Sequence, residues 1–379
     1  MMIKGLPKYN AAARGLKVAG ITLALAGMTA IAAHAAPVIS GSVEASANRN
    51  WATPDENTTN VFHSYDAQAN TFNLNNAHLA IAGADSATGL GYTVETDFGS
   101  DGALDASLAG SGPLTAAGYA IDLQEAYITW AFGAGRMWGI KAGKYATYQG
   151  IEVVEGGANP TITRGFLFGL AEPVTHTGAE INMANGPVDV HVGVINGWDQ
   201  AADQNAVPSY LAKIGYNMGA PLAVAVSAIV GPEKAGNTDD LRMSFDLTAV
   251  TKAIPMTDLW LQANYGMEEK AGVGGDDASW LGLGVQPLVH FNDWFGLGLR
   301  YEYFMDDKLS RVGAAGSVGT NTDITLQNIT VAPTIWLTKT AMIRAEFRVD
   351  MASEDVFADA DKKATGTQLG SAVDMVLGF

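Results

Sequence analysis

Segments in which apolar residues alternate with polar or small ones recur along the whole chain. The segments 188–194, 241–247, 259–265 and 297–305 show this alternation most clearly. A side-chain period of two residues is the period of a β-strand whose two faces differ in polarity. The sequence therefore predicts an all-β fold in which each strand has one apolar face and one polar or small face.

Charged residues indicate which way the predicted strands face. In the segment 343–350, four apolar residues alternate with Arg344, Glu346, Arg348 and Asp350. Its apolar residues also fit a helical i, i+4, i+8 spacing, but the neighbouring segments favour a strand. A lipid-facing Arg near the middle of a membrane costs about 2–4 kcal/mol. If this strand crosses a membrane, its charged face must therefore line the protein interior.

The start of the chain has the pattern of a secretory signal peptide. A basic stretch precedes an apolar run over residues 18–33, and Ala33-His34-Ala35 supplies a small-x-small cleavage site. We expect cleavage after Ala35, leaving residues 36–379 as the mature chain. A permanent signal anchor is the alternative, but the run is rich in Ala and Gly and His34 interrupts it. The basic residues of this stretch are Lys4, Lys8, Arg14 and Lys17.

Composition excludes several classes of protein. Residues 1–35 hold four basic residues and no acidic ones, so their removal changes the formal charge from −17 to −21, which argues against nucleic acid as a partner. The chain has 0 Cys, which excludes disulfides, a cysteine-linked lipid anchor and thiol-attached haem. After the leader, no apolar run approaches the ~20 residues of a membrane helix. A membrane-spanning mature protein would therefore have to be a closed barrel, whereas a secreted all-β domain has a similar composition.

Short and long connections alternate between the predicted strands. The short ones lie at 84–88, 133–136, 185–187, 217–221, 290–292 and 337–339, and the long ones at 45–70, 99–120, 145–174, 198–208, 231–240, 269–278, 306–322 and 352–366. This alternation is typical of an up-and-down antiparallel barrel in the outer-membrane lipid, with short periplasmic turns and long outer loops. It predicts about 16 strands around an aqueous channel, in one domain. Aromatic residues near the short turns fit an interfacial girdle, namely Trp130, Phe132, Trp138, Phe291, Trp294, Phe295 and Trp336.

The segment 371–379 also alternates and ends on an aromatic residue. It resembles the closing strand of bacterial outer-membrane barrels, which the β-barrel assembly machinery recognises. We expect this strand to pair with a first strand near Val38 and to point four side chains into lipid, namely Val373, Met375, Leu377 and Phe379. The edge strand of a soluble sandwich is the alternative.

The long connection between residues 144 and 178 carries a specific set of motifs. They are Gly143-Lys144-Tyr145, Gly150-Ile-Glu152-Val-Val-Glu155, Asn159-Pro160, Thr163-Arg164, Leu167-Phe168-Gly169-Leu170 and Pro173-Val-Thr175-His176-Thr177-Gly178. Further on stand Gly193-Val-Ile-Asn196-Gly197-Trp198-Asp199 and Gly231-Pro232-Glu233. Over about 143–231 the sequence resembles the OmpL-like family of β-barrel outer-membrane porins, beta-barrel porin-2. Gly165 departs from the family pattern, in which a bulkier residue follows the arginine.

The resemblance implies a Gram-negative outer-membrane porin, a water-filled channel for passive diffusion of small hydrophilic solutes or ions. The long connection mixes Phe166, Leu167, Phe168 and Leu170 with charged residues, so we expect it to fold into the barrel near residues 145–174 and narrow the channel. A structural plug or a cap on the outer rim is the alternative. The candidate constriction residues in this connection are Glu152, Glu155, Arg164, Glu172 and His176.

Charged residues on the polar faces of the strands are the candidate pore-lining residues. Mixed signs on facing walls would create a transverse field that favours small polar solutes, although any one of these residues could equally pair with a neighbour. The acidic excess lies mostly in the loops and predicts a preference for cations. The candidates are Glu95, Asp97, Lys141, Lys144, Lys213, Arg242, Asp246, Arg300, Glu302, Arg344, Glu346, Arg348 and Asp350.

Nothing in the sequence predicts catalytic, cofactor-binding or metal-binding residues, and no cofactor is expected. The chain has neither Gly-x-Ser-x-Gly nor His-Glu-x-x-His, and we expect His78, His191 and His290 to make structural hydrogen bonds. The acidic stretches 199–203 and 274–277 are expected to be solvated loops rather than calcium loops. A barrel hydrolase and a non-conducting scaffold, adhesin or sheath for a partner protein are the rival functions. A homotrimer is compatible with the sequence, since many porins are trimers.

Overall fold

The computed structural model of the chain describes residues 36–53, 59–108, 114–116, 119–219, 221–313 and 323–379. The predicted signal peptide, residues 1–35, lies outside the described residues.

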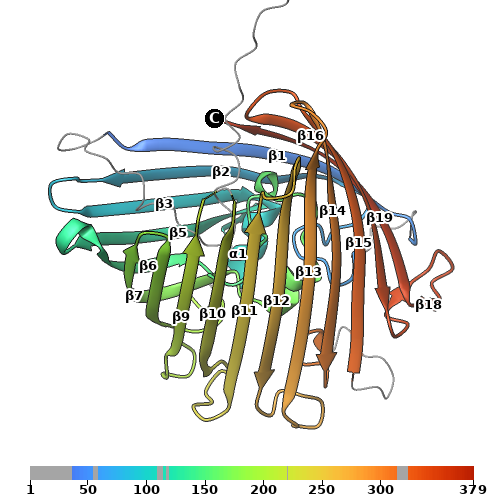
Figure 1. Cartoon of the computed structure of the whole chain (residues 1–379). Helices are drawn as coiled ribbons and strands as arrows, with labels where there is room; N and C mark the ends of the chain where they lie inside the picture. The colour runs from blue at the N-terminus through green and yellow to red at the C-terminus, as the bar shows by residue number, and fades with distance from the viewer. Residues whose placement is uncertain (1–35, 54–58, 109–113, 117–118, 220, 314–322) are drawn as a thin grey trace, which may run out of the picture.

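In the described part of the chain, sixteen long antiparallel strands form a closed barrel, which confirms the predicted fold class (Figure 1). Each strand pairs with its neighbours in sequence, as expected for an up-and-down barrel. The strands are β1 (Val38–Asn50), β2 (Phe72–Ala84), β3 (Leu90–Gly99), β5 (Tyr119–Phe132), β6 (Trp138–Ala146), β7 (Thr175–Asn185), β8 (Val188–Ile195), β9 (Ser209–Asn217), β10 (Ala223–Pro232), β11 (Leu241–Thr251), β12 (Thr257–Glu268), β13 (Ala278–His290), β14 (Phe295–Asp307), β15 (Asp323–Trp336), β16 (Ala341–Ala352) and β19 (Thr367–Gly378).

The seam of the barrel joins β1 to β19. Ser42 lies opposite Gly378, and the pairing continues to Asn50 opposite Gly370. The first strand is thus longer than the sequence indicated, since the long connection was expected to begin at Ala45. Its register against β2 shifts at a bulge between Glu44 and Ala45, whereas its pairing with β19 continues without a break to Asn50.

Short turns and long connections alternate around the barrel, as predicted. Figure 1 shows long connections, such as those from β10 to β11 and from β12 to β13, together at one end of the barrel. The turn from β11 to β12, residues 252–256, was not among the short connections named from the sequence. Two long connections carry extra strands, β4 (Leu114–Ala116) before β5 and the hairpin of β17 (Phe357–Ala358) with β18 (Ala364–Thr365) before β19.

Helices occur only as short pieces among the described residues. They are α1 (Ser100–Leu108), the 3₁₀ turns η2 (Ala134–Arg136) and η3 (Gly156–Ala158), and the single π turn η4 (Leu167–Ala171). No helix in the described part of the chain is long and apolar enough to cross a membrane.

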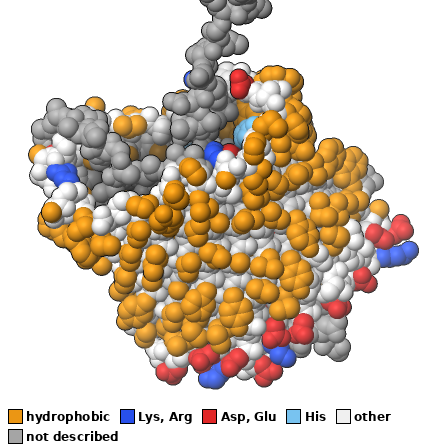
Figure 2. All heavy atoms as spheres, viewed as in Figure 1, with side chains coloured by type: hydrophobic (Ala, Val, Ile, Leu, Met, Phe, Trp, Pro, Cys, Tyr) orange, Lys and Arg blue, Asp and Glu red, His pale blue; other side chains and the backbone are white. Residues whose placement is uncertain are grey.

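The outer surface of the barrel is apolar and the inner face is polar. On β16, Phe347 is 62% exposed whereas its neighbour Arg348 is 2% exposed. In Figure 2 apolar side chains cover the middle of the wall, and charged side chains gather at the rim that holds the long connections. The side chains of Val373, Met375, Leu377 and Phe379 all point outward, with exposed fractions of 52%, 50%, 52% and 69%. Because the charged side chains lie at the rim and the apolar ones in the middle of the wall, the barrel has the outer surface that lipid requires.

Candidate functional site

The connection from β6 to β7, residues 147–174, packs against inward-facing side chains of the barrel wall, and we call it the inner loop. Ile151, Thr161 and Phe166 are completely buried, although a surface loop would normally expose such residues. The inner loop contains η3 and η4. Because buried backbone amides and carbonyls need hydrogen-bond partners, the wall must supply partners for this loop.

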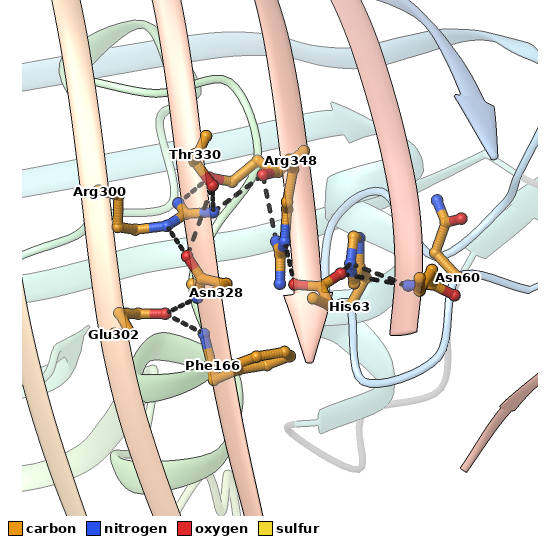
Figure 3. A network of polar contacts seen from close by, with 12 residues as sticks. Asn60, His63, Phe166, Arg300, Glu302, Asn328, Thr330 and Arg348 are labelled. Carbon is orange, nitrogen blue, oxygen red and sulfur yellow. Dashed lines mark hydrogen bonds and ion pairs between the residues drawn. The ribbon is translucent and has the colours of Figure 1, made fainter. Parts of the chain in front are cut away.

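Carboxylates of the wall accept hydrogen bonds from backbone amides of the inner loop. Glu302 on β14 accepts one from the Phe166 amide at 2.6 Å (Figure 3). Glu346 on β16 accepts from the amides of Ile162 and Thr163 at 2.5 and 3.2 Å. Backbone amides that are buried away from water need such acceptors, so these two residues hold the loop in place.

Guanidinium groups of the wall donate to backbone carbonyls of the inner loop. Arg344 on β16 donates to the carbonyl oxygens of Gly156, Asn159 and Thr161 at 3.0, 3.0 and 3.1 Å. Arg348, four residues later, donates to the Arg164 carbonyl oxygen at 2.7 Å. All three carbonyls of the first set are bound by Nη1 of Arg344, which carries two hydrogens, so at least one hydrogen is shared between two acceptors.

Arg300 on β14 links the inner loop to the neighbouring strand. Its Nη1 lies 2.9 Å from Glu152 Oε1 and 2.8 Å from Thr161 Oγ1. On the wall side, its Nε and Nη2 donate to Asn328 and Thr330 of β15, both at 3.1 Å (Figure 3). This buried cation is therefore paired and surrounded by hydrogen-bond acceptors, as its burial requires.

Charged side chains of the inner loop bind other parts of the loop and the neighbouring α1. Glu152 accepts a hydrogen bond from the Gly165 amide at 2.6 Å. Arg164 donates to the carbonyl oxygens of Ile162 and Val154 and lies 3.7 Å from a carboxylate oxygen of Asp101 in α1. A Cβ on Gly165 would lie 2.0 Å from Glu302 Oε1, so this position has no room for the bulkier residue of the family pattern.

A second set of contacts fixes the two ends of the loop. Asp246 on β11 accepts from the Gly150 amide at 3.0 Å, and Gln262 on β12 donates to Glu172 at 2.5 Å. Burial, together with the nearby Asp246, raises the pKa of Glu172 well above its usual value. Asp199, in the β8–β9 connection, accepts from the amides of Val174 and Thr175 at 2.6 and 2.9 Å. Burial raises the pKa of Asp199 to about 6.

An apolar core lies between the inner loop and the wall. Phe166, Leu167 and Ala171 of the loop pack against Trp280 and Phe304 of β13 and β14. The indole nitrogen of Trp280 donates to the Ala171 carbonyl oxygen at 3.2 Å and to Asn264 Oδ1 at 2.9 Å. Apolar burial and hydrogen bonding therefore act on the same stretch, and the barrel is filled here as a globular protein would be.

The first long connection of the chain also contacts the inner wall. His63 lies between Asp66 and Asp350, with 2.7 Å from its ring nitrogens to each carboxylate (Figure 3). The Tyr65 ring packs edge-on against Phe168 of the inner loop, with 5.5 Å between ring centroids. This role was not predicted, because residues 45–70 have the polar composition of an ordinary outer loop.

The remaining candidate residues lie on other parts of the wall. Lys141 is buried with its ammonium 4.0 Å from the Tyr145 ring centroid and 3.6 Å from Glu180. The other ion pairs are Lys144 with Asp122 at 3.0 Å, Lys213 with Asp189 at 2.8 Å and Arg242 with Glu268 at 2.7 Å.

The histidines of the strands and turns lie beside hydroxyl or carboxylate side chains. His176 is buried and lies 3.0 Å from Thr147 Oγ1. His191 contacts Glu180 at 2.8 Å, and His290 contacts Asp258 at 3.3 Å. His78 contacts Asp97 at 2.7 Å.

Of the two acidic stretches expected to be solvated, only one is. Asp276 and Asp277 are exposed, as predicted. The expectation was wrong for Asp199, which is partly buried and binds the end of the inner loop. Its neighbour Trp198, which packs edge-on against Trp280 with 6.1 Å between ring centroids, was the signal that this connection also turns inward.

The barrel and its inner loop can be compared with known proteins. The family model described as "Putative beta-barrel porin-2, OmpL-like" matches residues 38–379. No curated protein matches the sequence.

Solved structures of similar shape are outer-membrane proteins. The outer membrane channel DcaP of Acinetobacter baumannii is 14% identical with a TM-score of 0.62, and the match covers 94% of this chain and 100% of that one. The anion-selective porin from Comamonas acidovorans is 11% identical with a TM-score of 0.63, covering 91% and 99%. The trimer form of OmpT from Vibrio cholerae is 11% identical with a TM-score of 0.59, covering 92% and 100%. The match of the family model over nearly the whole barrel shows that this chain belongs to the OmpL-like beta-barrel porin-2 family, whose members are porins of the outer membrane.

Proposed function

We propose that this porin is a passive channel for small hydrophilic solutes or ions, narrowed by the inner loop. One observation carries the proposal: the backbone of the inner loop is bound by inward-facing charged residues of the wall, including Glu302, Arg344 and Glu346. A loop bound in this way occupies part of the cross-section of the barrel and reduces the space left for water.

The predicted lumenal charges then divide into two groups. Those on β14 and β16, such as Arg300 and Arg344, are about 1% exposed and anchor the loop. Glu95 and Lys144, on β3 and β6, keep side-chain exposures of 15% and 13%, and Glu155 is partly exposed on the loop. We assign the second group to the channel wall, where it would act on passing ions.

Engineered cysteines test the position of the loop, since the chain has 0 Cys of its own. A Cβ on Gly282 of β13 would lie 2.9 Å from Leu167 Cγ, so Leu167→Cys with Gly282→Cys places two sulfurs within bonding reach. Oxidation should cross-link this pair and increase its mobility on a denaturing gel. The matched pair Leu167→Cys with Leu283→Cys should stay open, because Leu283 is on the outer face with 45% exposure. Equal cross-linking of both pairs would contradict an inner loop.

Planar-bilayer recordings test the channel itself. Wild-type barrels should give stable ohmic steps. The double variant Glu302→Gln and Glu346→Gln replaces carboxyl groups that accept hydrogen bonds from the loop amides and should give larger and noisier steps. Tyr303→Phe on the outer face of β14 is the control and should conduct like the wild type. A folded wild-type barrel that stays silent would refute the channel and favour the scaffold, adhesin or sheath.

We also propose that the chain is not an enzyme. The porin family and the absence of the two hydrolase motifs from the sequence support this. Hydrolysis of ester or peptide substrates by the purified barrel, at a rate that a His176→Asn variant loses, would support the hydrolase instead.

Three further expectations concern the whole protein. We propose that residues 1–35 are a cleaved leader, which sequencing of the mature N-terminus would test. We propose that the β-barrel assembly machinery recognises β19 through Phe379, so Phe379→Ala should slow insertion. By analogy with the trimer form of OmpT, we propose a homotrimer, which native mass spectrometry of the detergent complex would test.

A further inference from the structure

A histidine and two glutamates meet where the inner loop approaches the wall of β2 and β3. They are His78 of β2, Glu95 of β3 and Glu155 of the inner loop, and one ligand atom from each lies within 4.8 Å of the others. None of them belongs to the network that anchors the loop to β14 and β16.

The histidine is oriented by a carboxylate on its far side. His78 is 6% exposed, and its Nδ1 lies 2.7 Å from Asp97 Oδ1, directly across the strand pair. Its Nε2 is buried without a hydrogen-bond partner and points toward Glu95, whose Oε2 is 3.7 Å away. That distance is beyond a hydrogen bond. A carboxylate–imidazole pair with a free Nε2 is the arrangement that holds histidine ligands of metal ions.

The charges of the cluster also call for a cation. With a neutral imidazole, the two glutamates alone bring two negative charges together beside Asp97. A proton on His78 could offset only one of them. A divalent cation would offset both and would satisfy the unpartnered Nε2 at the same time.

The donor set favours a particular class of metal ion. One imidazole nitrogen and two carboxylates suit Zn²⁺ and neighbouring first-row divalent ions, whereas Ca²⁺ and Mg²⁺ prefer oxygen ligands throughout. Metal–ligand distances near 2.0–2.2 Å would require the three groups to close by about 1 Å. Glu155 lies on a loop, so it can make this movement more easily than the two strand residues.

We propose that His78, Glu95 and Glu155 form a binding site for a first-row divalent metal ion such as Zn²⁺, with Asp97 as the positioning residue for His78. The bound ion joins the inner loop to β2 and β3, which are separated from the anchor strand β16 by β19 and β1. The site therefore gives the inner loop a further attachment, which depends on the metal ion.

Zinc binding to the full mature barrel in detergent tests the proposal directly. The protein is stripped with a chelator and titrated with Zn²⁺ alone, with calorimetry as the readout. One Zn²⁺ per barrel should bind with a dissociation constant in the micromolar range or below. His78→Asn and Glu155→Gln should each weaken binding by about 100-fold or more, since loss of even an outer-shell partner costs about 10–100-fold. Glu155→Gln changes only the loop, so the test stands even if His78→Asn fails to fold.

Two substitutions serve as matched controls. His290→Asn removes a histidine that also pairs with an aspartate, and Glu354→Gln removes a glutamate from another long connection. Both variants should bind Zn²⁺ as the wild type does. Binding that survives His78→Asn and Glu155→Gln unchanged, or that the controls lose equally, would overturn the site, as would the absence of saturable binding.

Asp97 needs a readout that separates positioning from folding. Asp97→Asn should weaken Zn²⁺ binding by about 10–100-fold while leaving one site per barrel. With Co²⁺ as the probe, the wild type should show the intense visible absorption of a four-coordinate site, and Asp97→Asn should shift that band. An unchanged spectrum and affinity would remove Asp97 from the site. Because these measurements do not use conductance, a barrel that binds Zn²⁺ but stays silent would refute the channel and leave the metal site intact.

Discussion

Arg344 and Asp374 lie directly opposite each other on β16 and β19, and the guanidinium Nε is 3.1 Å from both carboxylate oxygens. Both side chains are about 1% exposed. The same arginine binds three carbonyl oxygens of the inner loop. The ion pair therefore links β16 to β19, the strand at the barrel seam, and its arginine also links β16 to the inner loop.

Breaking this ion pair should destabilise the barrel. Asp374→Asn removes the nearest counterion of the buried Arg344 and leaves only the more distant Glu44 at 3.9 Å, so the free energy of unfolding should fall by up to about 3–5 kcal/mol. Urea unfolding in lipid vesicles, followed by tryptophan fluorescence, measures the change. The double variant Arg344→Met with Asp374→Leu removes both charges and should be less destabilised than Asp374→Asn. A double variant that loses more would show that the carbonyl contacts of Arg344, not the ion pair, dominate.

Gly266 on β12 should not tolerate a side chain. A Cβ there would lie 1.9 Å from Cζ2 of Trp280, whose ring is fixed by its hydrogen bonds to Ala171 and Asn264. Gly266→Ala should lower the free energy of unfolding by about 1–3 kcal/mol, the usual cost of overpacking. Gly370→Ala on β19 is the matched control, because its nearest neighbour, the Arg49 carbonyl oxygen, is 3.8 Å away. Equal effects of both substitutions would mean that the Trp280 ring can move aside.

The attachment of the inner loop at Asp199 should respond to pH. The pKa of this carboxyl group is about 6 in the folded protein, against 3.8 for an ordinary Asp, so the folded state binds the proton more tightly. Protonation therefore stabilises the folded state, and stability should fall as pH rises from about 4 to 6, by on the order of 2 kcal/mol. Unfolding of the wild type at pH 4.5 and pH 7, compared with Asp199→Asn, isolates this contribution. If Asp199→Asn shows the same pH dependence, another group is responsible.

Ion selectivity should depend on Lys144. Its ammonium lies 3.0 Å from Asp122 and 2.7 Å from the Leu123 carbonyl oxygen, so it offsets a carboxylate on the inner wall. We expect the wild type to prefer cations weakly, and Lys144→Gln should increase that preference by exposing the charge of Asp122. The reversal potential under a salt gradient measures both. Lys270→Gln, which changes a 66% exposed lysine on the outer rim, should have little effect. Anion preference in the wild type would contradict this account.

The architecture could be predicted from the sequence because the barrel wall obeys a simple rule. A strand such as 343–350 must place its charges on one side and its apolar residues on the other, and lipid penalises any exception. Phe347 and Arg348 follow this rule in the structure. The pairing of β1 with β19 followed from the same reasoning, because a barrel must close.

The contacts inside the barrel could not be predicted in the same way. The inward direction of Arg300 and Arg344 followed from the period of two residues, but several of their partners are backbone carbonyls of the inner loop, which no side-chain pattern reports. His63 and Asp199 come from connections whose polar composition matches that of exposed loops. Trp198 is a local hint for Asp199, because it is an aromatic residue in a polar connection, but the partners of both residues depend on the shape of the assembled barrel.

The triple contact of Arg344 has a consequence for how this porin can vary. In the inner loop, Arg344 donates hydrogen bonds to the backbone carbonyl oxygens of residues 156, 159 and 161. These oxygens are present whatever side chains the residues carry. Mutations that alter side chains in this stretch while preserving its backbone path leave the anchor in place. New solute preferences can therefore arise in the inner loop one substitution at a time, without first relocating its point of attachment.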